Sequence, residues 1–375
     1  MTAPSQAVDP NGLLEYSVVY TDRSLNHMSR SFQSVMNDIS STLKHVYNAN
    51  AVAIVPGSGT FGMEAVARQF ANNNHCLVIR NGWFSYRWTQ ILEMADLPKS
   101  CTVMKASQTY DDCQAPFAPA PIEDVVETIK AEKPAIVFAP HVETSAGIIL
   151  PTDYLKEVAE AVHSVGGLLV LDCIASGAVW VDMKDVGVDV LISAPQKGWS
   201  GSPCCGLVMM SDYAVARMQA TQSNSFACDL KKWSEIMNTY ENGGHAYHAT
   251  MPTDSLVRFS QVMQETKEYG FAKVHAAQIE LGQKIRAVLR NKGIKSVAAE
   301  GFEAPGVVVS YTADPSFQNG SKFSAEGMQI AAGVPLQCDE RADFQTFRLG
   351  LFGLDKLYDV DAAVAKFEHT LEKLL

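Results

Sequence analysis

Residues 168–198 read LLVLDCIASGAVWVDMKDVGVDVLISAPQKG and indicate the fold more clearly than any other part of the chain. They contain two short apolar runs, Leu168 to Asp172 and Asp189 to Ser193, and a polar residue follows or closes each run. Strands of a parallel sheet that helices cover on both faces are nearly continuous in apolar residues. The two runs therefore predict two buried strands, with Asp172 at the end of the first and Lys197 shortly after the second.

The same pattern continues on both sides of this stretch. Short β-rich runs alternate with helical runs from residue 50 to about residue 210, which is typical of βαβ units and a mainly parallel sheet. Three of the intervening stretches carry apolar residues at three- and four-residue spacing, as amphipathic helices do. The predicted strands are 51–55, 76–80, 101–105, 135–139, 168–172, 189–193 and 207–210, and the predicted helices are 61–70, 121–131 and 154–165. We therefore expect a doubly wound α/β domain with a seven-stranded sheet.

The composition changes after residue 253. Two long helical segments lead to two strands and a closing helix, the pattern of a smaller α+β domain, with predicted ranges 255–268, 271–292, 306–311, 344–349 and 360–375. A chain of 375 residues also exceeds the size at which one hydrophobic core stops growing. We expect a flexible N-terminal segment 1–20, a large α/β domain 21–253 and a small C-terminal α+β domain 254–375.

Charge and hydropathy exclude several classes of partner. The chain has 30 Lys and Arg against 41 Asp and Glu, a formal net charge of -11, so a nucleic-acid backbone would be repelled. No apolar run approaches the roughly 20 residues that span a bilayer, so we expect no membrane association. The first 20 residues contain no basic residue and no long apolar run, and match no targeting sequence. We expect a cytoplasmic protein.

The cysteines and histidines do not indicate a metal. The 8 cysteines are scattered without a C-x-x-C, which favours free thiols in a reducing compartment. His245 and His248 have a spacing that suits a metal on a helix. Gly243 and Gly244 weaken that helix, however, and no cysteine or carboxylate cluster joins the pair, so we expect no metal.

A glycine-rich segment follows the first strand and opens a helix. Gly57, Gly59 and Gly62 have the G-x-G-x-x-G spacing of dinucleotide-binding proteins. That fingerprint also needs an acidic residue about 20 positions later for the ribose, and the next strand ends in Arg80-Asn81 instead. NAD therefore loses support, while an NADP-binding oxidoreductase with Arg80 on the extra phosphate stays open. The segment itself predicts only that backbone N–H groups at a helix N-terminus bind some phosphate.

Asp172 and Lys197 indicate which phosphate compound is bound. Ligands of parallel α/β sheets bind outside the carboxyl ends of the strands, where both residues are predicted to lie. A buried aspartate needs a partner, and a plain ion pair with Lys197 would satisfy both. Pyridoxal phosphate (PLP) accounts for them better, because a carboxylate keeps its pyridine nitrogen protonated while a lysine amine reaches its aldehyde carbon as a Schiff base.

Several further segments complete a resemblance. From about residue 50 to the end, the chain resembles the class V aminotransferases of PLP fold type I, and within them the alanine:glyoxylate and serine:pyruvate aminotransferases. The resemblance implies a homodimeric PLP enzyme in which Lys197 carries the cofactor and moves the proton, and Asp172 pairs with the pyridinium. The segments that carry it are Asp172, Ser193 to Trp199, Ser58 to Thr60, Asn81 to Phe84 with Arg87, Glu143 to Ser145, Tyr247 to Thr250 and Phe347 to Gly350.

The resemblance also implies roles for other cofactor-binding residues. Ser58 opens the phosphate-binding segment, in which Gly59 and Thr60, together with Gln196, hold the phosphate. Thr144 lies near the ring hydroxyl. An aromatic residue stacks on the ring, and Phe84 takes that place unless the neighbouring Trp83 does.

Two more expectations concern the partner subunit and the substrate. Tyr247 and Thr250 match positions that reach the phosphate from the other subunit, which implies an obligate homodimer with shared active sites. Arg348 matches the arginine that clamps the substrate carboxylate, a planar anion that suits a guanidinium fork. The family's Gly-Pro-Gly-Pro-like segment, which shapes the substrate pocket, is replaced here by residues 20–29, where Asn26 alone matches.

We therefore expect a ping-pong transaminase that moves the amino group of alanine or serine to glyoxylate or pyruvate. A 2-aminoethylphosphonate:pyruvate aminotransferase would keep every cofactor residue and use Arg348 on the phosphonate. A cysteine desulfurase or other β-lyase would use Cys338 as the nucleophile, although Arg348 is followed by Leu-Gly rather than by the serine of desulfurases. A non-catalytic PLP-binding regulator would need a basic DNA-binding domain, which no segment supplies.

Overall fold

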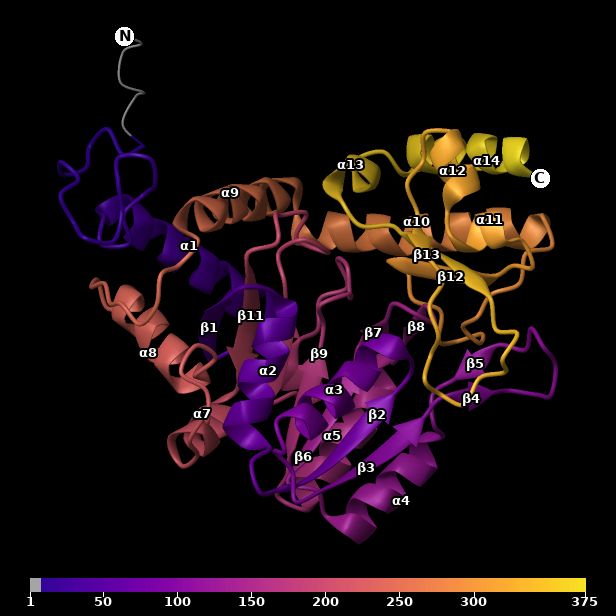
Figure 1. Ribbon diagram of the computed structural model, residues 1–375, viewed down its shortest axis with the longest axis horizontal. Coiled ribbons are helices and arrows are strands. Elements are labelled where there is room, and N and C mark those ends of the chain that lie inside the picture. Colours follow the sequence, from indigo (N-terminus) through magenta and orange to yellow (C-terminus); the bar gives the residue numbers. More distant parts are fainter. Residues whose placement is uncertain (1–7) are drawn as a thin grey trace.

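The computed structural model describes residues 8–375. At its centre lies a seven-stranded sheet in the order β1-β11-β10-β9-β6-β2-β3 (Figure 1). Strand β11 runs antiparallel to both of its neighbours and the other pairs are parallel, which confirms the predicted α/β fold class. Each predicted strand is present with ends within two residues: β1 (Ala51–Pro56), β2 (His75–Arg80), β3 (Ser100–Lys105), β6 (Ile136–Pro140), β9 (Leu168–Asp172), β10 (Val190–Ser193) and β11 (Cys205–Met210).

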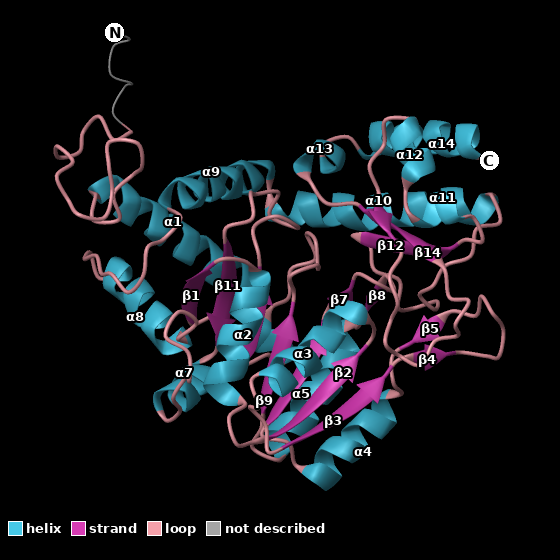
Figure 2. Ribbon diagram, viewed as in Figure 1, coloured by secondary structure: helices cyan, strands magenta, loops and turns pink. Residues whose placement is uncertain are grey.

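Helices cover both faces of this sheet (Figure 2). The crossovers through α2 (Gly59–Phe70) and α3 (Trp83–Met94) lead the chain toward the β3 edge, and those through α4 (Ile122–Glu132) and α5 (Thr152–Ser164) lead it back. Because crossovers between parallel strands are right-handed, the first two helices lie on one face and the other two lie on the opposite face. Short helices α6 (Met183–Val186), α7 (Asp212–Gln219) and α8 (Leu230–Glu241) complete this layer structure.

Helix α9 (Thr253–Tyr269) belongs to the core of the large domain. Its buried residues Leu256, Phe259 and Met263 share one hydrophobic cluster with α1 (Arg30–Tyr47), against which α9 packs. The second cluster begins with α10 (Phe271–Asn291). The boundary at residue 253 stays a prediction, but the packing groups α9 with the large domain, because helical periodicity shows that a helix has a buried face and not which core receives it.

The small domain lies beyond the carboxyl ends of the strands of the large sheet (Figure 1). Its three-stranded antiparallel sheet has the order β12-β14-β13, and α10 and α14 pack together beside it. The predicted strands and closing helix of this region are present. The elements are β12 (Val307–Tyr311), α11 (Pro315–Gln318), α12 (Ser321–Ala325), β13 (Ala331–Ala332), β14 (Thr346–Gly350), α13 (Leu354–Leu357) and α14 (Val360–Leu374).

Two short ribbons connect the domains. The pair β7 (Val142–Glu143) and β8 (Ile148–Ile149) forms a hairpin after β6, and β4 (Ser107–Gln108) pairs with β5 (Phe117–Ala118). Both ribbons contribute to a third apolar cluster, which includes residues of β12. The hairpin of β7 and β8 is thus fixed against the small domain as well as the large one.

The predicted flexible segment 1–20 lies partly outside the described residues, because the description begins at residue 8. From residue 8 to residue 20 the chain forms turns and bends without a helix or strand. Within residues 8–375, no helix is long and apolar enough to cross a bilayer.

Candidate active site

Asp172 ends β9 at the carboxyl edge of the sheet, where the strands of the large domain face the small domain. Its side chain is buried, and its Oδ1 accepts a hydrogen bond of 2.9 Å from the backbone N–H of Ile174. Burial, with a smaller contribution from Glu143, raises the pKa of Asp172 to about 7, against the opposing effects of that N–H and of nearby cations. The carboxylate is therefore placed to stabilise a positively charged partner, which residues 8–375 do not supply at bonding distance.

Lys197 lies in the loop after β10, as the sequence predicts. Its Nζ is 5.7 Å from the centroid of the Phe352 ring and, within residues 8–375, has no hydrogen bond or ion pair. A direct Asp172–Lys197 ion pair is thus absent from the described part of the chain, which argues against the plain ion-pair alternative. Burial, the positive charge of Arg348 and that of Arg87 lower the pKa of Lys197, and a neutral amine is the form that attacks a carbonyl.

The N-terminus of α2 forms a cradle of backbone donors at the same edge. Ser58 precedes the helix in an extended conformation, and its hydroxyl does not cap the helix. The N–H groups of Gly59 and Thr60 have no backbone acceptor, as expected of the first turn of a helix. A Cβ atom on Gly59 would lie 2.6 Å from the end of the Ile174 side chain, so glycine lets the helix begin this close to the loop after β9 without displacing Ile174. The cradle suits a phosphate group.

Buried polar side chains near this edge lack partners. Gln196 Oε1 and both amide atoms of Asn81 are buried without a hydrogen bond in the described structure. Such groups destabilise a fold by about 1 to 3 kcal/mol each unless a ligand or water satisfies them. Together with the free donors of the cradle, Asp172 and the unpaired Lys197 amine, they fit a compact ligand with a phosphate, a ring nitrogen and a carbonyl carbon, as PLP has.

Phe84 faces two guanidinium groups. The Cζ atom of Arg87 is 5.3 Å from the Phe84 ring centroid, and that of Arg348 is 5.5 Å from it. Arg87 Nη1 donates a hydrogen bond of 3.0 Å to Thr60 Oγ1, which joins this group to the cradle. The ring of Trp83 contacts Tyr86 instead, at 5.8 Å between centroids. The geometry therefore favours Phe84 over Trp83 as the aromatic residue of the site.

Arg348 reaches the site from β14 of the small domain. Its Nε donates a hydrogen bond of 2.7 Å to the backbone oxygen of Ala332 on β13, which leaves the two Nη groups free for a ligand. Burial lowers the pKa of Arg348, and the negative charge of Glu143 acts in the opposite direction. A partly buried guanidinium with two unpaired nitrogens is a binding group for a carboxylate or another planar anion.

Glu143 belongs to a segment that carries the family resemblance, but the sequence alone assigns it no role in the site. Its carboxylate is fully buried and accepts hydrogen bonds from the backbone N–H groups of Phe84, Ser85 and Ser145 (2.8–3.2 Å) and from both serine hydroxyls. It thereby ties the N-terminus of α3, which carries Phe84, to the hairpin that carries Thr144. The sequence signal for such a residue is an acidic side chain shortly after the buried strand 135–139, two positions before Ser145.

Thr144 and His141 flank Glu143 in the same segment. Thr144 is buried at the start of the turn between β7 and β8. His141 is also buried, and its Nδ1 lies 2.7 Å from Ser176 Oγ. Its backbone N–H donates a hydrogen bond to the backbone oxygen of Asp172. Burial lowers the pKa of His141 to about 4, so this imidazole is neutral near pH 7.

Three predicted residues are not brought to Lys197 of the same chain. Tyr247 is 54% exposed, its hydroxyl lies 3.1 Å from Thr250 Oγ1, and its ring contacts His27 at 5.6 Å between centroids. Figure 1 shows that their loop, between α8 and α9, lies on the opposite side of the molecule from the small domain. The Nδ2 of Asn26 donates to Glu15 and orders the N-terminal segment instead.

The residues on which the NADP and desulfurase alternatives depend are held in structural surroundings instead. The guanidinium of Arg80 donates to the backbone oxygen of Gln337 (3.1 Å) and to the hydroxyl of Thr89 (2.8 Å), so it does not face a nucleotide. Cys338 is buried, and burial raises the pKa of its thiol to about 12, which opposes a role as nucleophile. Across residues 8–375, no group of three or more potential ligand side chains is arranged to hold a metal ion.

Comparisons with known proteins identify the family of the chain. Residues 11–309 match the model of the family described as aminotransferase class-V. A 2-aminoethylphosphonate–pyruvate transaminase of Syntrophobacter fumaroxidans is 27% identical over 86% of this chain and 84% of its own. Alanine–glyoxylate aminotransferase 1 of Saccharomyces cerevisiae is 25% identical over 83% of this chain and 82% of its own.

A solved structure shows the same fold. The alanine–glyoxylate aminotransferase of Nostoc sp. superposes with a TM-score of 0.79 at 19% identity, over 94% of this chain and 89% of that one. The family model covers well over half of the 375 residues, and the arrangement of Lys197, Asp172 and the helix cradle fits the cofactor of that family. The chain therefore belongs to the class V aminotransferase family and is a PLP-dependent aminotransferase of fold type I.

Proposed function

We propose that this aminotransferase moves the amino group of a small L-amino acid, alanine or serine, to glyoxylate or pyruvate. The proposal rests on the placement of Arg348, whose guanidinium Cζ is 5.5 Å from the Phe84 ring centroid and whose Nη groups have no hydrogen bond within the described residues. Its positive charge is also near enough to the Lys197 amine to lower the pKa of that amine. A substrate held there by its carboxylate has its amino group within reach of the cofactor carbonyl. The relatives named for alanine and glyoxylate support this choice.

The proposed roles of the cofactor-binding residues follow from the contacts. Bound PLP supplies an electron sink that acidifies the Cα–H bond of the amino acid. The backbone of Gly59 and Thr60 would bind the phosphate, with Ser58 and Gln196 beside it, and Phe84 would pack on the ring. Glu143 would hold Phe84 and Thr144 in register. Together these side chains would fix the orientation in which cofactor and substrate meet.

Asp172 and Lys197 would manage the protons. The buried Asp172 carboxylate keeps a proton on the ring nitrogen, because a positive partner offsets the cost of burying the carboxylate. The amine of Lys197, whose pKa burial lowers, accepts the proton from the substrate Cα and delivers it to the neighbouring carbon. The same lysine would hold the cofactor through its side-chain amine.

We also propose a cytoplasmic homodimer in which each active site uses both subunits. Tyr247 and Thr250 are exposed, and within residues 8–375 neither contacts Lys197 of its own chain, as a contribution to a partner's site requires. The N-terminal segment supports a partner surface, because it exposes Leu13, Leu14 and Val18 by 98%, 87% and 103%. All 8 cysteines are free, which suits a reducing compartment.

The competing candidate substrate is 2-aminoethylphosphonate. Relatives that cover 86% of this chain are named for 2-aminoethylphosphonate and pyruvate. Arg87 and Arg348 both contact the Phe84 ring, and their two guanidinium groups would provide two positive charges for a phosphonate dianion. One Nη of Arg87 is already hydrogen-bonded to Thr60, which leaves Arg348 as the freer group and favours a carboxylate.

A screen of half-reactions tests the proposal. The holoenzyme is mixed with single amino acids, 2-aminoethylphosphonate or cysteine, and the visible absorbance of the cofactor is followed while the released oxo compound is identified chromatographically. We expect alanine or serine to convert the cofactor fastest. Faster conversion by 2-aminoethylphosphonate, or release of sulfide from cysteine, would replace the proposed substrate by the competing one.

A further inference from the structure

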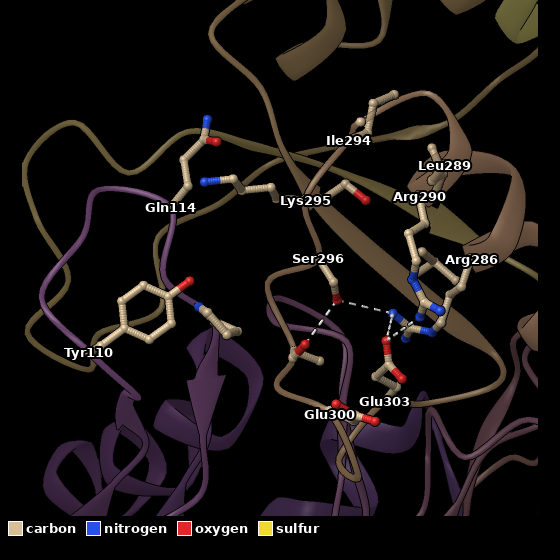
Figure 3. Close-up of a pocket in the computed structure, with 15 residues that line it drawn as sticks. Tyr110, Gln114, Arg286, Leu289, Arg290, Ile294, Lys295, Ser296, Glu300 and Glu303 are labelled. Carbon is tan, nitrogen blue, oxygen red and sulfur yellow. Dashed lines mark hydrogen bonds and ion pairs between the residues drawn. The ribbon is translucent and has the colours of Figure 1, made fainter.

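A second pocket lies at the junction of the two domains. It has a volume of about 570 Å³, and its walls come from α10, from the loop between α10 and β12, and from the large-domain loop that carries Tyr110 and Gln114 (Figure 3). None of the residues of the active site described above lines it. Its volume lies within the range of small-molecule sites, which often form between domains. We call it the interdomain pocket.

A buried arginine at this pocket has an unused donor. Arg286 is 8% exposed, and its Nη2 donates to the backbone oxygens of Ala304 (2.8 Å), Val307 (3.0 Å) and, at 3.4 Å, Gly147. Its Nε is buried and has no acceptor within the described residues. Burial lowers the pKa of Arg286 to about 10, so a bound negative charge would offset the cost of burying this cation.

The opposite wall of the interdomain pocket offers more unused donors. Figure 3 shows Lys295 extending toward Gln114, with Tyr110 on the same side of the pocket. Lys295 Nζ has one ion-pair contact, with Asp112 at 4.0 Å, and is therefore not hydrogen-bonded to it. The Tyr110 hydroxyl and the Gln114 side-chain amide have no hydrogen bond in the part of the chain that the structure describes.

The charges of the lining indicate the ligand. Three cations line the pocket, Arg286, Arg290 and Lys295, against two carboxylates, Glu300 and Glu303. One oxygen of Glu303 lies 3.8 Å from each arginine, so a single carboxylate serves both without a hydrogen bond. The lining thus has one net positive charge and a surplus of donors, which matches a singly charged anion better than a dianion.

We propose that the interdomain pocket binds a small monoanionic carboxylate, of the size of a 2-hydroxy or 2-oxo acid. The carboxylate accepts hydrogen bonds from the head groups of Lys295 and Arg290, beside the buried positive charge of Arg286, and its polar substituent meets Tyr110 or Gln114. A phosphate dianion would face Glu300 and Glu303 with more negative charge than the cations offset.

The pocket is connected to the active site through the backbone. The oxygen of Gly147, which Arg286 contacts, also accepts from the N–H of Ala304 (2.8 Å), and the N–H of Ile149 donates to Phe302 (2.8 Å). The loop that forms one wall of the interdomain pocket is therefore paired with the hairpin that carries Thr144. A carboxylate bound in the interdomain pocket would therefore stabilise the junction of the two domains.

Calorimetric titration of the holoenzyme with lactate tests the proposal, because lactate has no amino or oxo group to react. The titration is made in an Arg348→Ala background, which removes carboxylate binding at the active site. We expect lactate binding to persist there and to weaken by about tenfold in Arg348→Ala/Arg290→Ala/Lys295→Ala, since charge-assisted hydrogen bonds are lost. Adding Tyr110→Phe to the Arg348→Ala background should weaken it by a smaller factor.

The matched control removes two lysines outside the pocket, Lys284 and Lys292, which form surface ion pairs with Asp361 and Glu372. In the Arg348→Ala background, Lys284→Ala/Lys292→Ala lowers the net charge equally and should leave lactate binding unchanged, which separates a local contact from a general loss of charge. Inorganic phosphate and methylammonium serve as ligand controls. The proposal is overturned if lactate does not bind to Arg348→Ala, if both charge-reduced variants weaken it equally, or if phosphate binds more tightly. Because no step requires turnover, a wrong substrate assignment would leave these results unaffected.

Discussion

Replacement of Arg348 by lysine separates the shape of the proposed clamp from its charge. In the wild type, Nε is held by Ala332 and both Nη groups are available to a carboxylate. Lysine keeps the charge but has one head group, so it cannot hold the strand contact and a bidentate carboxylate together. The lost charge-assisted hydrogen bond contributes about 1.5 to 3 kcal/mol, so kcat/KM for alanine or serine should fall by roughly 10- to 100-fold.

The assay is steady-state transamination with glyoxylate as acceptor, with cofactor absorbance recorded for each variant. Arg348→Lys and Arg348→Ala should bind the cofactor as the wild type does, and Arg348→Ala should lose more activity. Arg341→Lys is the matched control, because Arg341 precedes β14, is exposed, and pairs only with surface acids such as Asp343 within the described structure. An Arg348→Ala enzyme that transaminates alanine at the wild-type rate would refute the clamp.

Three further predictions follow from the site. Asp172→Asn should lower kcat by about 100- to 1,000-fold, because the protonated ring nitrogen of the cofactor would lose its carboxylate partner. Cofactor titration should also show weaker binding, and unchanged kinetics would contradict the proposed pairing. His141 has a pKa lowered to about 4, so its folded form resists protonation and the protein should lose about 3 kcal/mol of stability as pH falls from 6.5 to 4. Denaturant unfolding should show a shallower pH slope for His141→Gln, and an unaltered slope would rule out this contribution. Mixed Lys197→Ala and Tyr247→Phe/Thr250→Ala subunits should regain activity through one complete hybrid site, and proven subunit exchange without recovery would count against shared sites.

The strands, and the position of Lys197 after one of them, were predictable because their signals are local. Each buried strand of the parallel sheet is a short apolar run, and the residue types that follow the strands meet at one edge whatever the order of the strands. Helix α1 was predictable as well, since Phe32, Met36, Ile39 and Leu43 recur at helical spacing after Ser29, which caps the helix. No helix over residues 30–47 is among the sequence predictions.

Other features depend on long-range packing that a sequence pattern does not contain. The position of α9 in the large-domain core depends on its contact with α1, which lies more than 200 residues earlier. Three of the five hydrogen bonds of Glu143 join two segments about 60 residues apart. The interdomain pocket exists only because α10 and the Tyr110 loop meet across the domain junction. The proposed roles of Tyr247 and Thr250 depend on a second subunit, beyond any single chain.

The most direct test of the central claim is to locate the lysine that carries the cofactor. The holoenzyme is reduced with borohydride, digested with trypsin, and the cofactor-bearing peptide is sequenced by mass spectrometry. Because a reduced lysine resists trypsin, attachment at Lys197 predicts one labelled peptide of residues 185–217, with no cleavage after residue 197. A label on any other lysine, or a labelled fraction cleaved after Lys197, would contradict the proposed active site.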